Sequence, residues 1–580
     1  MRALVVIVLA LLSVVYVGLD QVWLSTDEGI QTTDAAYHFS RIAALRAKLL
    51  GLEQTTGFDG QRYGGLVYYL AAAISLFTGL SPERLLFALN LLLRPLLVCA
   101  LYRLGWEFAT PPRRVWAGLL SASFALLLPG LVNYGRVFVL DLPLTVAVAW
   151  AIVCALTALR AQAEADPRGL ALVGLGLCSG AALLIKLNAV AFLVGPLWVV
   201  FRSDLRQMWS RRPQRAAMGA TAAGIVLLSL TSAVISGSRG EALQRTLKEA
   251  TWPGALIFGY VPEGSAHLFA RDWLQASLNQ GWEAAYYTWL QTLTPPWALL
   301  ALPAFVWFFG RRHGCTHRLG HNQRDLAFWW FILPTLSVTL GLRGLYDERY
   351  VLPLLPLTAA LIACTMVDLR PRWLRRLAMV AILTGGALNH GYVHHDVWPT
   401  SRPLACATVA GWGDSERVGD ELWACLSYPK YSFMDRSASP RQLDLPIDAI
   451  QAVLAPLREE TGTPLRAVFL DDLYEVFYRL FQSSLLEEKP LLRHEDVLLV
   501  TNCWDQDSMT AMFETHEEVN RQIRAADVVL MRYGSKGDGN GPLLGRRCEV
   551  FWTQTVWFDD LGEVELPDGT SVRMWRKLRR

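Results

Sequence analysis

Apolar stretches of about twenty residues recur along the first two thirds of the chain, and short joints rich in arginine separate them. A helix needs about 20 apolar residues to cross a bilayer. Eleven stretches come close to that length, so the pattern predicts a multi-span α-helical membrane protein. The predicted spans lie near 3–24, 85–105, 115–131, 138–159, 169–186, 188–201, 216–235, 294–310, 326–342, 351–367 and 377–393.

A further uncharged stretch, 63–80, is rich in Gly and Tyr, and its length does not decide whether it crosses. Charge decides it. If 63–80 lies in the membrane interface and the N-terminus is inside, nineteen arginines fall in inner joints. The short outer joints then hold only Arg136, Lys186, Arg343 and Arg349. A crossing at 63–80 would reverse every later loop and destroy this positive-inside bias. We therefore expect an interfacial helix there and a cytoplasmic N-terminus.

This orientation divides the chain into two predicted parts. Residues 1–393 form a transmembrane domain with long outer loops at 25–84 and 236–293. Residues 394–580 have the mixed polarity of a soluble domain, and they lie outside the cytoplasm in this orientation. Loop 236–293 contains a Trp/Tyr-rich stretch typical of helices lying on a membrane, although a plain surface spacer fits it equally well.

The pattern after residue 394 predicts an α/β domain. Helices are expected at 447–461, 471–481 and 514–526, strands at 466–470, 497–502 and 528–531, a solvated Gly-rich turn at 534–541, and a hairpin of 563–566 with 571–575. Four cysteines fall in this domain, namely Cys406, Cys425, Cys503 and Cys548. An even number of cysteines in an oxidising compartment allows two disulfides, and four cysteines permit three pairings. Proximity in the sequence favours Cys406–Cys425 with Cys503–Cys548, and the other pairings stay open.

Composition adds little beyond these patterns. Hydrophobic residues make up 53% of the 580 residues, above the roughly 45–50% usual for soluble proteins. The formal net charge is +3, and its basic residues cluster in the joints between spans, which argues against nucleic acid as a partner. The His- and Cys-containing segment 313–321 sits in such a joint, where a surface role is favoured over a metal site.

Charged residues at the outer membrane boundary are the candidate site. Charge at a membrane boundary or within it is costly and suggests function. Arginine and lysine would bind a phosphate, and a carboxylate would accept a proton from an acceptor. The candidates are Asp34, Arg136, Asp141, Lys186, Asp347, Glu348 and Arg349, with Arg94 deeper in the second span.

Each candidate also has a purely structural explanation. Lys186 could extend to the lipid headgroups, and Arg94 could pair with a neighbouring span. Arg136 and Asp141 could form a simple boundary pair. Acidic residues such as Asp34 could cap helices, because carboxylates favour helix N-termini. The residues alone leave these alternatives open.

Four segments together resemble the GT-C glycosyltransferases, specifically the protein-O-mannosyltransferase-like group (glycosyltransferase family 39) and the related aminoarabinose lipid A transferases. The segments are TTDAAYHFSRIAALR (32–46), GRVFVLDLPLT (135–145), GAALLIKLNAVAFLVGP (180–196) and YDERYVLPLLPL (346–357). The resemblance follows the order and spacing of residues 1–393. It departs from the family at Asp34-Ala35, where Asp-Glu is common, so Asp27-Glu28 is an alternative acidic motif. The stretch 63–80 also lacks the usual Pro-Pro.

The resemblance implies a bacterial enzyme of the cytoplasmic (inner) membrane. It would transfer a sugar from a polyprenyl-phosphate donor to a lipid, glycan or protein acceptor on the outer face, with inversion at the anomeric carbon. Asp34 would be the general base, and Asp141 with Arg136 would organise the second side of the site. Lys186 and Arg349 would bind the carrier phosphate.

Tyr37, Glu348 and Arg94 are further candidate substrate-binding residues. A divalent cation shared by Asp34 and Asp141 is an open alternative to a site without metal. Two rival functions are a transporter or flippase for a lipid-linked substrate and a non-catalytic scaffold. No internal repeat of the kind found in many transporters is visible in the sequence.

Overall fold

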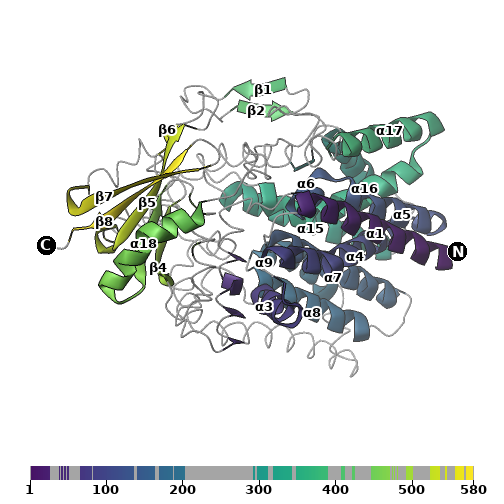
Figure 1. Ribbon diagram of the computed structural model, residues 1–580. Coiled ribbons are helices and arrows are strands. Elements are labelled where there is room, and N and C mark those ends of the chain that lie inside the picture. The colour runs from purple at the N-terminus through teal and green to yellow at the C-terminus, as the bar shows by residue number, and fades with distance from the viewer. Residues whose placement is uncertain are drawn as a thin grey trace, which may run out of the picture. The chain divides into compact units, whose positions relative to one another are not determined.

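The fold is seen in a computed structural model (Figure 1). It describes residues 2–26, 38–50 without 40, 44, 47 and 48, 66–80, 82–135, 140–163, 169–186, 188–202, 292–310 without 294–296, 318–341, 348–389, 407–411, 421–424, 446–470, 473, 476, 480, 491–500, 521–535 without 522, 543–544, 555–566 and 570–578. The chain divides into two compact units. The first contains residues 1–23, 59–67 and 86–433, and the second contains 24–58, 68–85 and 434–580.

The first unit is helical, apart from a small two-stranded antiparallel sheet of β1 (Ala407–Gly411) and β2 (Glu421–Ala424). Two helices, α1 (Arg2–Thr26) and α4 (Pro82–Phe108), lie mainly in this unit. Its other helical elements are η1 (Pro111–Arg113), α5 (Arg114–Ser123), η2 (Phe124–Leu126), α6 (Pro129–Tyr134), α7 (Asp141–Ala163), α8 (Gly169–Ile185), α9 (Ala189–Arg202), Trp297–Gly310, α15 (Arg318–Gly341), η4 (Glu348–Leu354), α16 (Leu355–Asp368) and α17 (Arg372–Asn389).

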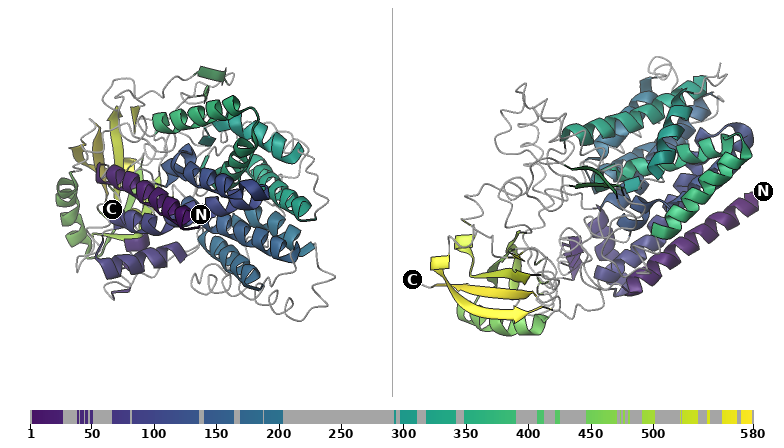
Figure 2. Two further views of the ribbon diagram at one scale, coloured as in Figure 1. Left: turned by 90° about the vertical axis from the view of Figure 1, so that its right-hand side faces the viewer. Right: turned by 90° about the horizontal axis from the view of Figure 1, so that it is seen from above.

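Helix α7 is the centre of the first unit. It packs against α8, α9 and α15 (Figures 1 and 2). It also packs against η4. Glycine permits close approach between these helices: a Cβ at Gly174 in α8 would lie 2.9 Å from the sulfur of Cys154 in α7. A Cβ at Gly195 in α9 would lie 2.6 Å from the Cβ of Trp329 in α15. The residues of α7 are mostly buried, as expected of a helix enclosed on several sides.

Apolar helices support a multi-pass membrane protein. Within the described part of the chain, four helical stretches are long and apolar enough to cross a bilayer: 3–21, 88–108, 141–161 and 351–368. Shorter apolar helices occupy 67–78, 169–185, 189–202 and 297–310. The predicted span 115–131 is divided among α5, η2 and α6, and 216–235 lies outside the described residues. The count of eleven crossings stays a prediction.

The second unit contains a mixed sheet with strand order β4-β3-β5-β8-β7. Strands β3 (Leu465–Leu470), β4 (Leu492–Val500) and β5 (Val528–Ser535) are parallel, whereas β7 (Phe558–Glu565) and β8 (Ser571–Lys577) form an antiparallel hairpin beside β5. The two-residue strand β6 (Leu543–Leu544) pairs with β5, and η7 (Thr555–Trp557) precedes β7. Helix α3 (Leu66–Thr78) lies mostly in this unit.

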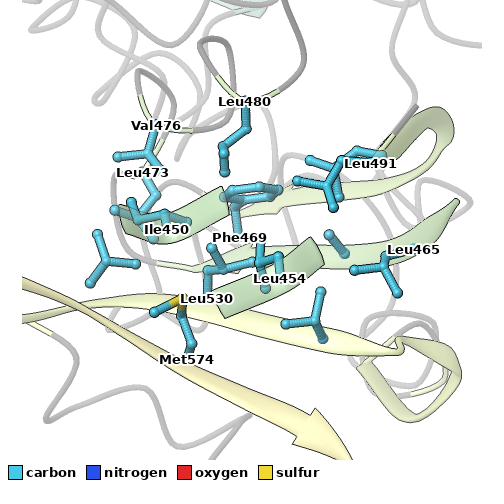
Figure 3. Close-up of a cluster of buried hydrophobic side chains, with 14 of the residues drawn as sticks. Ile450, Leu454, Leu465, Phe469, Leu473, Val476, Leu480, Leu491, Leu530 and Met574 are labelled. Carbon is cyan, nitrogen blue, oxygen red and sulfur yellow. The ribbon is translucent and has the colours of Figure 1, made fainter. Parts of the chain in front are cut away.

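Alternating side chains give the sheet two hydrophobic faces. Phe469, Leu530 and Met574 belong to one cluster, which also contains Leu454 of α18 (Ile447–Thr461) (Figure 3). The neighbours Val468, Leu470, Val529, Met531 and Trp575 belong to a second cluster. Strand β3 is therefore buried on both faces, as is usual for a central parallel strand.

The expected α/β pattern is present in the described part of this domain. Helix α18 has the predicted bounds 447–461, and the hairpin is confirmed but longer than predicted. The strand expected at 528–531 continues to Ser535 because β8 pairs with it along that length. The predicted helices 471–481 and 514–526 are described only in part. The four predicted disulfide cysteines, most of turn 534–541 and most of loop 236–293 lie outside the described residues.

Candidate functional site

Lys186 and Asp141 meet at one end of α7. Asp141 is the first residue of α7, and Lys186 directly follows α8. The Lys186 Nζ donates a hydrogen bond of 2.8 Å to Asp141 Oδ1. Asp141 is 1% exposed and Lys186 is 8% exposed, so this lysine does not extend freely toward headgroups. A buried carboxylate and ammonium are tolerated because each compensates the other.

The turn that carries Lys186 is held by backbone bonds. The Lys186 amide donates to the Ala182 carbonyl at 3.0 Å, and the Ala189 amide donates to the Lys186 carbonyl at 3.1 Å. Asn188 follows two residues later and is 4% exposed. Its Oδ1 has no hydrogen-bond partner among the residues that the structure describes. Close to the Lys186–Asp141 pair there is thus a buried amide oxygen able to accept a hydrogen bond.

A third predicted segment lies against the same helix. Element η4 begins at Glu348 and Arg349, and it packs against both α6 and α7. The structure thus brings together three of the four segments singled out in the sequence, 135–145, 180–196 and 346–357. Arg136 and Asp347 lie outside the described residues, and for Glu348 and Arg349 only the backbone is described.

The first segment, 32–46, contributes a buried contact to the second unit. His38 Nδ1 and the Tyr68 hydroxyl lie 2.7 Å apart, and each residue is 2% exposed. Tyr68 belongs to α3, which occupies the stretch predicted to be interfacial. Two stretches of the predicted first outer loop are therefore joined through side chains. Asp34 and Tyr37, just before His38, lie outside the described residues.

Arg94 is part of a different buried group. Its Nε donates to Asp20 Oδ2 at 2.7 Å, and its Nη1 donates to the Tyr16 hydroxyl at 2.5 Å. Arg94 is fully buried and Asp20 is 1% exposed. The structure therefore pairs this arginine with the first span, one of the alternatives left open by the sequence. Asp20 was missed, although a carboxylate inside an apolar span is itself a signal.

This buried group also holds the segment that leads to Asp141. Arg94 Nη1 reaches the Leu131 carbonyl of α6 at 3.2 Å, and Asn90 Nδ2 reaches the Gly135 carbonyl at 2.9 Å. A Cβ at Gly135 would overlap the guanidinium of Arg94, so no larger residue fits there without displacement. Arg94 and Asn90 thus hold the backbone at Leu131 and Gly135, a few residues before Asp141 in the sequence.

A metal site is not visible among the described residues, where no group of three or more His, Cys, Asp or Glu side chains gathers. Asp34 lies outside them, so a cation shared by Asp34 and Asp141 is untested.

No protein-family profile matches the sequence, and no curated protein matches it. Solved structures do resemble the fold. The aminoarabinose transferase ArnT from Cupriavidus metallidurans in the apo state is 12% identical, with 97% of each chain covered and a TM-score of 0.49. The structure of the same protein bound to undecaprenyl phosphate has a TM-score of 0.47.

A second resemblance is to the oligosaccharyltransferase AglB from Archaeoglobus fulgidus, solved with a tethered acceptor peptide containing the NVT sequon. That structure is 11% identical, covers 91% of this chain and 69% of its own, and has a TM-score of 0.51. Its apo form gives the same values. At this identity the likeness concerns the fold. The chain has the fold seen in that oligosaccharyltransferase, which is a member of the GT-C superfamily.

Proposed function

We propose that the chain is a glycosyltransferase of the bacterial cytoplasmic membrane that transfers a sugar from a polyprenyl-phosphate carrier to an acceptor on the extracytoplasmic side. The observation that carries this proposal is the buried Lys186–Asp141 pair at the end of α7, where three motif segments meet within a GT-C fold. Charged residues at the boundary of a membrane domain are costly even when they are paired, and they usually mark a functional site.

Lys186 and Arg349 bind the carrier phosphate in this proposal. The phosphate is the leaving group, and its negative charge grows as the bond to the anomeric carbon breaks. Cations placed beside it stabilise the transition state more than the ground state. Asp141 pairs with Lys186 at the place proposed for the carrier phosphate and balances its charge there.

Asp34 is the proposed general base. An acceptor hydroxyl attacks the anomeric carbon, its proton passes to Asp34, and the carrier phosphate leaves with the electron pair of the broken bond. A single displacement of this kind inverts the anomeric centre. Arg136 and Asp141 orient the sugar in this proposal. Tyr37 and Glu348 are further residues that bind the substrates. The unpartnered Asn188 Oδ1 is suited to accept a bond from a sugar hydroxyl.

The acceptor is a lipid, a glycan or a protein hydroxyl. A peptide is one candidate because the archaeal oligosaccharyltransferase was solved with an acceptor peptide. The specific membership in glycosyltransferase family 39 rests on the four sequence segments alone.

The test is release of free polyprenyl phosphate from polyprenyl-phosphate sugars by the purified protein in lipid nanodiscs. Asp34→Asn should lower release by about 10²–10⁴-fold, the usual contribution of a general base. Asp27→Asn is the matched control in the same loop and should leave release near normal. Loss of activity in Asp27→Asn alone would move the base to the alternative acidic motif. No release by the folded wild-type protein with any carrier sugar would refute transfer and favour a transporter or scaffold.

A further inference from the structure

Three arginines surround one tryptophan at the end of α7 opposite Asp141. The guanidinium carbons of Arg103, Arg114 and Arg160 lie 4.9, 4.6 and 4.2 Å from the centroid of the Trp106 ring. Glu107, 1% exposed, pairs with Arg103 at 3.0 Å and also with Arg160. We call these five residues the Trp106 cluster.

The Trp106 cluster has more positive than negative charge. Its three guanidinium groups and one carboxylate leave a net charge of +2. Arg114 has no carboxylate partner among the residues that the structure describes, and its buried Nε has no hydrogen-bond partner there. Cation–π contacts with one shared ring stabilise each arginine modestly. A bound anion would reduce the repulsion among the three guanidinium groups.

Close helix packing assembles the cluster. A Cβ at Gly105 of α4 would lie 2.6 Å from the Ala117 carbonyl oxygen of α5, and a Cβ at Gly118 would lie 2.8 Å from the Tyr102 ring. This close approach brings Arg114, the first residue of α5, over Trp106 near the end of α4. The cluster is therefore a preformed arrangement of three elements, α4, α5 and α7.

The cluster lies at the membrane surface opposite the proposed active site. Asp141 and Arg160 are separated by nineteen positions in α7, which at 1.5 Å per residue is about 28 Å. The hydrocarbon core of a bilayer is about 30 Å thick. With Asp141 at the outer boundary, the Trp106 cluster lies at the inner one. An anion bound there is separate from the carrier phosphate.

The adjoining surface fits an acyl chain. Leu92 and Leu96 of α4 are exposed, and Arg103 follows at helical spacing on the same face, about 10 Å further along than Leu96. Trp116, two residues after Arg114, is 68% exposed, as is typical of an aromatic side chain at the membrane interface. The acyl chain of a lipid would lie along this apolar stripe, and a negatively charged headgroup would lie at the arginine where the stripe ends.

We propose that the Trp106 cluster binds the phosphate headgroup of an anionic phospholipid of the inner leaflet, with Arg103 and Arg114 as direct ligands and Glu107 holding Arg160 and Arg103 in place. This site does not depend on the transfer reaction. Basic recesses between transmembrane helices on the cytoplasmic side are suited to such headgroups.

Native mass spectrometry of the full-length protein in detergent tests the proposal, with phosphatidylglycerol and phosphatidylcholine as probes. The wild type should bind phosphatidylglycerol at least about tenfold more tightly than phosphatidylcholine. Arg103→Gln/Arg114→Gln should remove most of that preference, since each arginine near an anionic headgroup contributes substantially. Arg114→Lys should keep part of it. The matched control is Arg113→Gln, because Arg113 is already paired with Asp368 at the same end of the protein.

Equal binding of phosphatidylglycerol by the double variant and the wild type would overturn the proposal. An equal loss in Arg113→Gln would overturn it too, since the effect would then be one of general surface charge. Displacement of bound phosphatidylglycerol by millimolar inorganic phosphate would show that free phosphate, and not a lipid, is the occupant. Thermal unfolding of each variant confirms that it is folded.

Discussion

The Nζ of Lys186 lies 2.8 Å from Oδ1 of Asp141, so one ion pair joins the turn after α8 to the first residue of α7. Removing one member leaves an uncompensated buried charge, which typically costs about 3–5 kcal/mol. We expect Lys186→Met and Asp141→Asn each to destabilise the protein by that order. The double variant should lose clearly less than the sum, because it leaves no unpaired charge.

Thermal unfolding of the purified protein in detergent measures this coupling. The control is Arg202→Met, which removes the half-exposed Arg202–Asp325 pair and should cost about 1 kcal/mol or less. Strictly additive losses for Lys186→Met and Asp141→Asn would show that the pair is not coupled.

Gly135 lies against the guanidinium of Arg94, where no Cβ fits. Gly135→Ala should therefore displace Arg94 or the backbone, destabilise the protein by about 1–3 kcal/mol and lower polyprenyl phosphate release. Gly18→Ala is the matched control, because nothing lies within 4 Å of a Cβ at Gly18 in α1. Unfolding temperature and release rate, measured together on both variants, check this. Equal effects at the two glycines would contradict it.

The carboxylate of Asp560 accepts a hydrogen bond from Arg573, and this bond holds the pKa of Asp560 below its usual value. A lowered folded-state pKa stabilises the domain at pH values above the ordinary aspartate pKa of about 3.9. That contribution is lost as the pH falls through the lowered value. We expect Arg573→Met to move the pKa of Asp560 upward, as measured by carboxyl carbon chemical shifts during an acid titration. An unchanged titration curve would rule out Arg573 as the cause.

Leu454 is fully buried between α18 and the sheet (Figure 3). Leu454→Ala should destabilise the C-terminal domain by about 2–5 kcal/mol, because it removes apolar contacts and leaves a cavity. Val556→Ala, at a site that is 65% exposed, should change stability very little. Chemical denaturation followed by circular dichroism compares the two. Similar midpoints for both variants would mean that α18 does not pack on the sheet as described.

The orientation of the chain can be tested with a reporter at the C-terminus. The arginine bias of the joints places residues 394–580 outside the cytoplasm. A C-terminal alkaline phosphatase fusion should therefore be active in a bacterial host, and a fluorescent protein exported to the same place should stay dark. The reverse result would place the stretch 63–80 across the membrane.

The sequence by itself determined the class of the protein. The length of the apolar stretches and the distribution of arginine between them reflect the membrane and water around each segment. They can therefore be interpreted without knowledge of any tertiary contact. Local periodicity likewise predicted α18 with its observed bounds and the hairpin of β7 and β8, because alternating and helical patterns reflect burial on one face. The motif segments predicted a GT-C fold, and the structure resembles that of the archaeal oligosaccharyltransferase, a GT-C member.

Only the tertiary structure decided which charged residues meet. Asp141 and Lys186 are 45 positions apart and Asp20 and Arg94 are 74 apart. Such pairings depend on how helices pack. From the sequence alone, Asp141 could belong to a functional site or to a simple boundary pair with Arg136. Lys186 could likewise bind a phosphate or extend to the lipid headgroups. Packing paired Lys186 with Asp141 and Arg94 with Asp20, because burial makes an unpaired charge costly. The close approach of α4 and α5 also gathered three arginines around Trp106.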